Sequence, residues 1–257
     1  MTDDDSPQVL DPRTAYARWA ASYPPHAHNP LMQAEERAVL SLFPVDLRGR
    51  RVVDAGCGSG RYMLHALRRG AAHVVGADLS PEMLERARAE LGADQVAVTP
   101  TLSGRNPPQV DLIEASIAAL PLRKGCADLT VCGLTIGHLP ALEPVLAELQ
   151  RITRTGCSIL CSDFHPLVYQ RGGRREFSAS GQRYAVRHTP HFIDDWRRAC
   201  TALELDIVRV LELPLEPHDI RGTARFDPAA LEGPVVIVFE LASAASHGRH
   251  RRRRALG

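Results

Sequence analysis

The segment Val52–Tyr62 constrains the fold more than any other part of this 257-residue chain. It reads VVDAGCGSGRY: the end of an apolar strand with an acidic residue, three glycines at alternating positions, and the start of a helix. A strand that turns sharply into a helix through glycines is typical of the first unit of a βαβ fold. The spacing differs from the GxGxxG loop of dinucleotide-binding proteins, whose last glycine would fall at Arg61.

Strands and helices alternate along the rest of the chain. Apolar runs predict strands at residues 51–54, 73–77, 110–115, 127–134, 158–164, 206–213 and 234–241. The helical spacing of apolar residues predicts helices near 11–23, 30–43, 60–69, 81–91, 142–154 and 195–205. This order predicts an α/β fold, with a doubly wound, Rossmann-like sheet of seven mostly parallel strands. Its ligand is expected at the carboxyl ends of the strands.

The chain is expected to have three parts. Residues 1–45 form a helical lid, residues 46–242 form the ligand-binding domain, and residues 243–257 form a disordered basic tail. Residues 165–195 are a small insertion after the fifth strand, and alternation at 177–187 predicts a hairpin there. We expect this insertion to cover the substrate.

Charge and composition exclude several classes of protein. The net charge of +1 is no nucleic-acid footprint spread over a whole domain, although five arginines lie in the tail. The first residues, MTDDDS, do not resemble a secretory signal, and the apolar runs are shorter than the roughly 18 residues that cross a bilayer. Six cysteines are scattered among apolar residues, as is typical of reduced thiols. We therefore expect a cytoplasmic protein with no membrane partner.

Two acidic residues at strand ends indicate the ligand. Asp54 would repel a pyrophosphate approaching the glycine loop, so a phosphate ligand is disfavoured. Asp78 ends the second strand, where a carboxylate can accept both hydroxyls of a ribose. A ligand with an ammonium group, an adenosine and no phosphate suits this pair, and S-adenosylmethionine (SAM) has all three properties. Asp54 would then face its ammonium.

Several motifs in the expected order resemble those of class I SAM-dependent methyltransferases. Val52–Tyr62 resembles the family's first motif and Ala77–Leu84 (ADLSPEML) its second. Ala115–Leu122 (ASIAALPL) and Leu149–Gly156 are similar to two later segments. The N-terminal stretch Tyr16–Tyr23 (YARWAASY) is similar to a helix of the small-molecule branch. That branch includes ubiquinone and menaquinone C-methyltransferases and the malonyl-carrier-protein methyl-ester enzyme.

The loop chemistry and the resemblance together imply a set of cofactor-binding residues. They are Tyr23, Asp54, Gly56, Cys57, Gly58, Gly60, Asp78, Leu79, Met83, Ser116, Ile117 and Leu134. Ser116 stands where the family usually has an Asp that receives the adenine amino group, so this bond is weaker or made by backbone, with Ile117 stacking on the ring. No metal is expected, because His188 and His191 have no third clear ligand.

Methyl transfer is an in-line displacement, which chiefly requires alignment of the reactants and exclusion of water. A general base is needed only for a nucleophile that arrives protonated. His138 and His165 follow the fourth and fifth strands and are the candidate catalytic residues, although His138 can also cap a helix and His165 can line the pocket wall. The candidate acceptor-binding residues are Tyr16, Trp19, His138, Phe164, His165, Arg174, Tyr184 and His188.

The sequence therefore predicts an enzyme that uses SAM to methylate a small-molecule acceptor at oxygen, nitrogen or carbon. Three alternatives stay open: a carboxyl methyltransferase acting on a carrier-bound acyl chain, a nucleic-acid methyltransferase, and a SAM-binding protein without catalysis. The arginine tail is the only support for a nucleic-acid partner. Asn106–Gln109 (NPPQ) lacks the aromatic residue of the NPPY tetrapeptide that base-methylating relatives use. A homodimer is left open.

Overall fold

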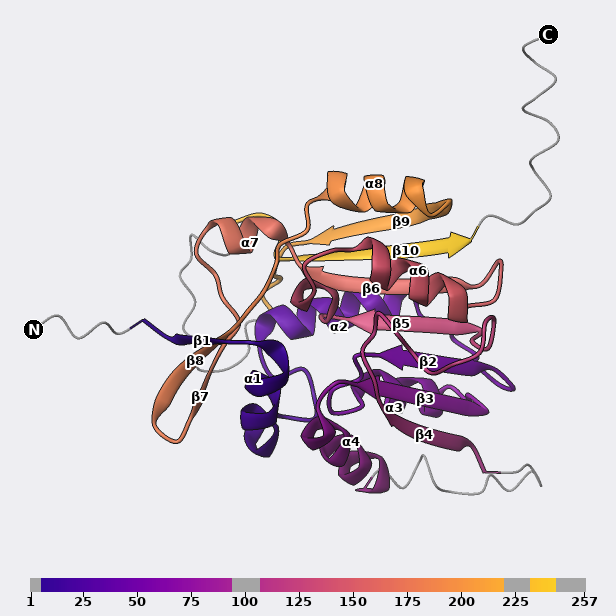
Figure 1. The fold of residues 1–257 in the computed structure, drawn as a ribbon, viewed down its shortest axis with the longest axis horizontal. Coiled ribbons are helices and arrows are strands. Elements are labelled where there is room, and N and C mark those ends of the chain that lie inside the picture. The colour runs from indigo at the N-terminus through magenta and orange to yellow at the C-terminus, as the bar shows by residue number, and fades with distance from the viewer. Residues whose placement is uncertain (1–5, 94–106, 220–231, 244–257) are drawn as a thin grey trace, which may run out of the picture.

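The computed structural model describes residues 6–93, 107–219 and 232–243. Its centre is a seven-stranded sheet with the order β4-β3-β2-β5-β6-β10-β9 (Figure 1). The strands are β2 (Arg51–Ala55), β3 (His73–Asp78), β4 (Gln109–Glu114), β5 (Leu129–Gly133), β6 (Ser158–Phe164), β9 (Leu205–Leu213) and β10 (Val236–Ser243). The first five pair in parallel, and β10 is antiparallel to β6 and β9. The predicted doubly wound, mostly parallel sheet is confirmed.

Helices cover both faces of this sheet. Residues of α2 (Pro30–Leu42), α3 (Arg61–Arg68) and α4 (Pro81–Ala93) belong to one apolar cluster. Residues of α6 (Glu143–Ile152) and α8 (Ile193–Ala202) belong to the cluster on the other face. Because both faces of β2, β3, β5 and β6 are buried, these strands are mostly apolar in the sequence rather than alternating, whereas the edge strand β4 (QVDLIE) is largely exposed.

Three helices begin in the same way, with a polar cap followed by proline. The side chains of Asp11, Asn29 and Ser80 accept hydrogen bonds from backbone N–H groups three residues later, at 3.1, 2.9 and 3.3 Å. Each satisfies one of the donors that a helix start leaves unpaired, and proline at the next position needs no partner. The expected cap at Ser80 is confirmed, and it places the end of β3 close to the start of α4.

A smaller layer lies at the end of the sheet toward which the parallel strands point (Figure 1). It contains α1 (Pro12–Trp19), the 3-10 turn η1 (Ala20–Ser22), α7 (Pro166–Gln170) and a hairpin of β7 (Glu176–Ala179) and β8 (Gln182–Val186). The predicted hairpin is confirmed. The sequence did not predict β1 (Gln8–Leu10), which pairs in parallel with β8 to give the sheet β1-β8-β7. β1 has only three residues and its partner strand lies over 170 positions further along the chain, so the local sequence does not indicate this pairing.

Residues 244–257 of the expected basic tail lie outside the described residues, and Ser243 still belongs to β10. The roles of residues 1–45 as a lid and of 165–195 as a substrate cover stay predictions. In the parts of the chain that the structure describes, no helix is long and apolar enough to cross a membrane.

Candidate active site

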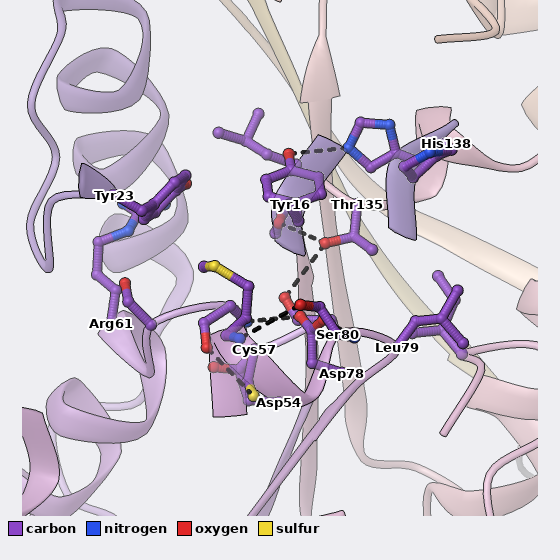
Figure 2. Close-up of a pocket in the computed structure, with 18 of the residues that line it drawn as sticks. Tyr16, Tyr23, Asp54, Cys57, Arg61, Asp78, Leu79, Ser80, Thr135 and His138 are labelled. Carbon is purple, nitrogen blue, oxygen red and sulfur yellow. Dashed lines mark hydrogen bonds between the residues drawn. The ribbon is translucent and has the colours of Figure 1, made fainter. Parts of the chain in front are cut away.

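A cavity of about 240 Å³ lies where the carboxyl ends of the central strands meet the N-terminal helix (Figure 2). It brings together most of the predicted cofactor-binding residues with two of the predicted acceptor-binding residues. Those that line it are Tyr16, Tyr23, Asp54, Gly56, Cys57, Gly58, Asp78, Leu79, Met83, Ser116, Ile117, Leu134 and His138. The cavity does not include Trp19, Gly60, Phe164, His165, Arg174, Tyr184 or His188 among its lining residues.

The glycine loop is held tightly at Gly56. Its φ of +78° lies in the left-handed region, and its N–H donates to the carbonyl of Ala77 at 2.7 Å. A Cβ at this position would lie only 2.4 Å from the side chain of Thr135. Thr135 in turn donates from Oγ1 to the carbonyl of Gly56 at 3.2 Å. Thr135 therefore clamps the loop to the end of β5, a role that sequence reasoning missed.

Asp54 lies at the bottom of the pocket as an unpaired carboxylate. Both of its oxygens are buried, and neither has a hydrogen-bond partner. Burial raises the pKa of Asp54 to about 7; Arg61 lowers it in part, and Asp78 raises it further. A buried carboxylate without a partner is unfavourable, and a cationic group in the pocket would compensate it. This site fits the ammonium group expected from the sequence.

Asp78 is held in place by backbone donors. Its Oδ2 accepts from the N–H of Gly58 at 2.8 Å and its Oδ1 accepts from the N–H of Ser80 at 2.9 Å. Burial raises the pKa of Asp78, and these donors oppose the shift. A carboxylate has about four acceptor positions, so two remain for the hydroxyls of a ribose.

Apolar side chains adjoin Asp78 on the side where an adenine would follow the ribose. Leu79 is 45% exposed, and Ile117 is buried beneath the pocket surface. Ser116 accepts from the N–H of Ala118 at 3.3 Å, so its Oγ is already used in a local turn. The hydroxyl proton of Ser116 is still free to be donated, which agrees with the weaker adenine contact expected there.

A buried ion pair supports the loop from below, and sequence reasoning missed it. Glu35 of α2 is fully buried and accepts from Arg61 Nη2 and from the hydroxyl of Tyr62, both at 2.6 Å. Arg61 lines the pocket, and its Nη1 is buried without a hydrogen-bond partner. The sequence signal that could have indicated this ion pair is Glu35, a glutamate on the apolar face of the helix predicted near residues 30–43.

At the end of the pocket away from Asp54 and Asp78, three side chains form a hydrogen-bonded chain. The hydroxyl of Tyr16 lies 3.0 Å from His138 Nε2, as Figure 2 shows. Arg175, which precedes β7, donates from Nη1 to the Tyr16 hydroxyl and to the carbonyl of Leu134. The sequence predicted that both Arg175 and its neighbour Arg174 line the acceptor pocket, but only Arg175 is among the residues that line the cavity. The pairing of the hairpin decides which of the two points inward.

His138 is neutral in this arrangement. Its Nδ1 lies 3.1 Å from the carbonyl of Arg187, and a carbonyl only accepts, so Nδ1 carries the proton and Nε2 accepts from Tyr16. Burial, and then the charge of Arg175, hold the pKa of His138 well below its usual range. A histidine in this state accepts protons weakly.

Other predicted site residues lie elsewhere. His165 accepts the N–H of Leu167 on Nδ1 at 3.2 Å and places Nε2 2.9 Å from Glu212, so it caps α7 instead of reaching the pocket. His188 lies behind His138, with ring centroids 6.0 Å apart, and its Nε2 is 3.8 Å from an oxygen of Asp163. Because both ring nitrogens of His165 are engaged, His165 is not a candidate for the general base.

The remaining predicted residues form the support around the site. Trp19 stacks on Phe177 at 4.8 Å, Tyr184 belongs to the same apolar cluster, and Phe164 lies under the Arg175 guanidinium. The guanidinium of Arg174 lies 3.8 Å from the ring centre of Tyr169, outside the cavity. Gly60, with a φ of +86°, packs its Cα toward Ala87 of α4. Within the described ranges, no three His, Cys, Asp or Glu side chains form a metal-binding group.

Comparison with known proteins gives a consistent family. The family profile described as "Methyltransferase domain" matches residues 53–161. Over 222 residues the chain is 29% identical to the malonyl-[acyl-carrier protein] O-methyltransferase of Pectobacterium atrosepticum, which covers 84% of this chain and 76% of that protein. It is 39% identical to the ribosomal protein L11 methyltransferase of Aeromonas hydrophila over 106 residues, which are 40% of this chain and 36% of that protein.

A solved structure shows the same fold. Geranyl diphosphate C-methyltransferase of Streptomyces coelicolor, in complex with Mg²⁺, geranyl diphosphate and S-adenosyl-L-homocysteine, aligns with a TM-score of 0.61 at 15% identity. The alignment covers 82% of this chain and 79% of that one. The names of these three proteins give very different acceptors, so the likenesses leave the acceptor undetermined.

The profile match spans the strands and the glycine loop that form the cofactor end of the pocket. The likeness to the malonyl-[acyl-carrier protein] O-methyltransferase and to the geranyl diphosphate C-methyltransferase extends beyond this region, whereas the likeness to the ribosomal protein L11 methyltransferase covers 40% of this chain. Residues 53–161 are therefore a methyltransferase domain of the class I, SAM-dependent kind, whose methyl donor is SAM.

Proposed function

We propose that the protein methylates a small-molecule acceptor at oxygen, nitrogen or carbon by in-line displacement. The observation that carries this proposal is a partly enclosed pocket with two chemically different ends. Asp54 and Asp78 lie at one end, and Tyr16, His138 and Arg175 lie at the other. A concave pocket of this kind suits a small acceptor better than a polymer, which needs an open groove.

The residues present fit SAM. Asp54 faces the ammonium, Asp78 accepts from the ribose, and the unpartnered Nη1 of Arg61 donates to the amino-acid carboxylate. Leu79 and Ile117 flank the adenine. When bound, SAM supplies an electrophilic methyl group on a sulfonium.

The chain itself contributes alignment and exclusion of water. Tyr16 and Tyr23 come from the N-terminal segment and cover the pocket, and burial raises the pKa of both hydroxyls. Both tyrosines therefore stay neutral and act as fixed hydrogen-bonding walls. A dry site that holds two reactants in line can supply much of the rate enhancement that a displacement of this kind requires.

His138 is the candidate catalytic residue that the geometry retains, and its role is to orient Tyr16. We expect His138→Ala to lower turnover by less than about tenfold, since a histidine with such a low pKa is a poor base. The measurement is the initial rate of S-adenosylhomocysteine formation between pH 5.5 and 8.5. A loss of about 10²–10⁴-fold, with a pH step present only in the wild type, would show instead that His138 removes a proton from the acceptor.

The proposed function is tested in two stages. Calorimetry with S-adenosylhomocysteine first establishes whether the pocket binds the cofactor product. Transfer from SAM labelled in its methyl group to panels of carboxylic acids, phenols and amines then identifies the acceptor class. Binding without transfer to any panel, or transfer only to added nucleic acid, would contradict the proposal and support one of the other readings of the sequence.

Carboxyl methylation of a carrier-bound acyl chain is a second candidate. It is favoured by the likeness to a malonyl-[acyl-carrier protein] O-methyltransferase over 84% of this chain. The product distinguishes the candidates, because a methyl ester releases labelled methanol in alkali and a methylated amine or carbon does not.

A cytoplasmic location belongs to the same proposal and is supported by six free cysteines.

A further inference from the structure

Three residues that line the pocket contain buried polar atoms with no hydrogen-bond partner in the described part of the chain. They are Asp54, through both carboxylate oxygens, Arg61, through Nη1, and Arg175, through Nη2. Buried polar atoms in native proteins are nearly always paired, so unpaired atoms that face one cavity indicate groups that a ligand must supply. A ligand that pairs with all three residues must therefore carry one cationic group and two anionic groups.

The cofactor accounts for two of the three. Its ammonium pairs with Asp54, and its carboxylate pairs with Arg61 at the start of α3. Arg61 already has its charge balanced by Glu35 at 2.6 Å and Glu36 at 3.7 Å, so it offers a donor rather than a net charge. Figure 2 shows Arg61 beside the glycine loop and away from His138, which lies with Tyr16 at the other end of the pocket.

Arg175 makes no ion pair with any described residue, and its hydrogen-bonding neighbours in the pocket are the neutral Tyr16 and His138. Burial lowers the pKa of Arg175, but the hydrogen bond to the Tyr16 hydroxyl and the charge of the buried Asp163 raise it above the usual value, so the guanidinium is charged. Burial raises the pKa of Asp163 to about 7, so near neutral pH this carboxylate balances the charge of Arg175 only in part. A buried charge without a partner is strongly unfavourable, and binding of an anion removes that penalty.

The guanidinium is also rigidly held. Its face lies 4.6 Å from the ring centre of Phe164, and Nη1 is fixed by the hydroxyl of Tyr16 and by the carbonyl of Leu134 at 3.0 Å. The backbone carbonyl of Arg175 accepts from the N–H of Val186 at 2.9 Å, which ties the residue to the hairpin. The guanidinium of this pocket-lining residue is therefore already ordered, with Nη2 left as its unused donor.

We propose that Arg175 forms a carboxylate-binding subsite for the methyl acceptor. The inference rests on the proposed function, because it takes the cofactor to occupy the Asp54 end. One guanidinium without an ion pair matches a single negative charge, and the lining holds no lysine or second arginine without an ion pair that a phosphate dianion would require. The acceptor is therefore a carboxylic acid in its ionised form.

The test uses the full chain saturated with S-adenosylhomocysteine, titrated with hexanoate and with its neutral isostere hexanamide at constant ionic strength. Calorimetry should show hexanoate binding at least about tenfold more tightly than hexanamide, because only the carboxylate pairs with Arg175. Arg175→Met should remove this preference, and Arg175→Lys should restore part of it. Arg197→Met, which removes an exposed arginine on α8, should leave the preference unchanged. Equal binding of hexanoate and hexanamide by the wild-type complex would overturn the proposal.

A second measurement separates the acceptor's carboxylate from that of the cofactor. If Arg175 serves the acceptor, Arg175→Met binds S-adenosylhomocysteine within about twofold of the wild type, while Arg61→Met binds it more weakly. The proposal is wrong if Arg175→Met weakens S-adenosylhomocysteine but leaves 5′-deoxy-5′-methylthioadenosine, which lacks the carboxylate, unaffected. Failure of the wild type to bind S-adenosylhomocysteine would instead contradict the proposed function. Thermal unfolding checks that each variant is folded, and the wild-type contrast between the two probes needs no variant.

Discussion

The two ends of the pocket are built in different ways. At the cofactor end, Asp54, Gly56 and Asp78 lie within 25 residues, each at the end of a strand or in the turn that follows it. At the acceptor end, Tyr16 meets His138 across 122 positions of the chain and Arg175 across 159. The first end follows from local sequence and the parallel order of strands, whereas the second exists only after the N-terminal helix and the insertion have packed on the sheet.

This difference explains why one fold serves many acceptors. The carboxyl ends of adjacent parallel strands meet whatever the loops contain, so the donor site is preserved while the covering segments change. It also implies that substitutions at the two ends should affect different measurements. Changes at the cofactor end should weaken S-adenosylhomocysteine binding, and changes at the acceptor end should leave it nearly intact.

The largest effect is expected for Gly56→Ala. A Cβ there overlaps Thr135 at 2.4 Å, and the φ of +78° is strained for alanine, so the loop must move out of its binding conformation. We expect S-adenosylhomocysteine affinity to fall by at least about 100-fold by calorimetry. Gly49→Ala is the matched control, since Gly49 has a φ of +74° but open space around its Cα. Equal losses of affinity in both variants would mean that the strain of a positive φ, and not the contact between the new Cβ and Thr135, weakens binding.

Asp78→Ala should weaken the same binding by about 1.5–3 kcal/mol, because the charge-assisted bonds to the ribose are lost. The backbone donors of Gly58 and Ser80 also lose their acceptor, which places the effect toward the upper value. Asp194→Ala removes an exposed carboxylate on α8 and serves as the control. Unchanged affinity in Asp78→Ala would remove the ribose assignment.

The pH dependence of binding sharpens the role of Asp54. With a pKa of about 7 in the free protein, Asp54 is largely protonated at pH 6 and must lose its proton to pair with an ammonium. S-adenosylhomocysteine should therefore bind about fivefold to tenfold more weakly at pH 6 than at pH 7.5. Methylthioadenosine lacks the ammonium and should show no such step, and Asp54→Asn should abolish it. A flat profile for the wild type would place the ammonium elsewhere.

The smallest effect is expected for removal of residues 247–257. The residues that line the pocket all lie between 11 and 175, so neither end depends directly on this segment. S-adenosylhomocysteine affinity and transfer to a small acceptor should stay within about twofold of the full chain. A large loss of turnover with unchanged cofactor binding would instead favour a polyanionic substrate, because the segment removed carries five arginines.

Sequence reasoning identified most of the residues that line the pocket around Asp54 and Asp78, and few of those that line it around Tyr16 and Arg175. Asp54, Gly56, Gly58 and Asp78 were found because strand ends and glycine turns are local signals. Among the acceptor residues, Tyr16 and His138 were found from motif order, but His165 was misplaced because an N-cap and a pocket wall have the same sequence signature. The sequence analysis did not predict the buried ion pair of Glu35 or the hydrogen bond that ties Thr135 to the glycine loop.

What the sequence by itself determined is the order of strands, the glycine loop and the two carboxylates, Asp54 and Asp78, at the strand ends that line the pocket. Each of these depends on periodicity or on residues within one turn of each other, so short-range physics specifies it. Only the tertiary structure decided that Arg175, rather than Arg174, enters the pocket, and that β1 joins the hairpin. Adjacent residues in an extended segment point to opposite sides, so which arginine is buried depends on the pairing register, and that register is set by contacts far apart in the chain.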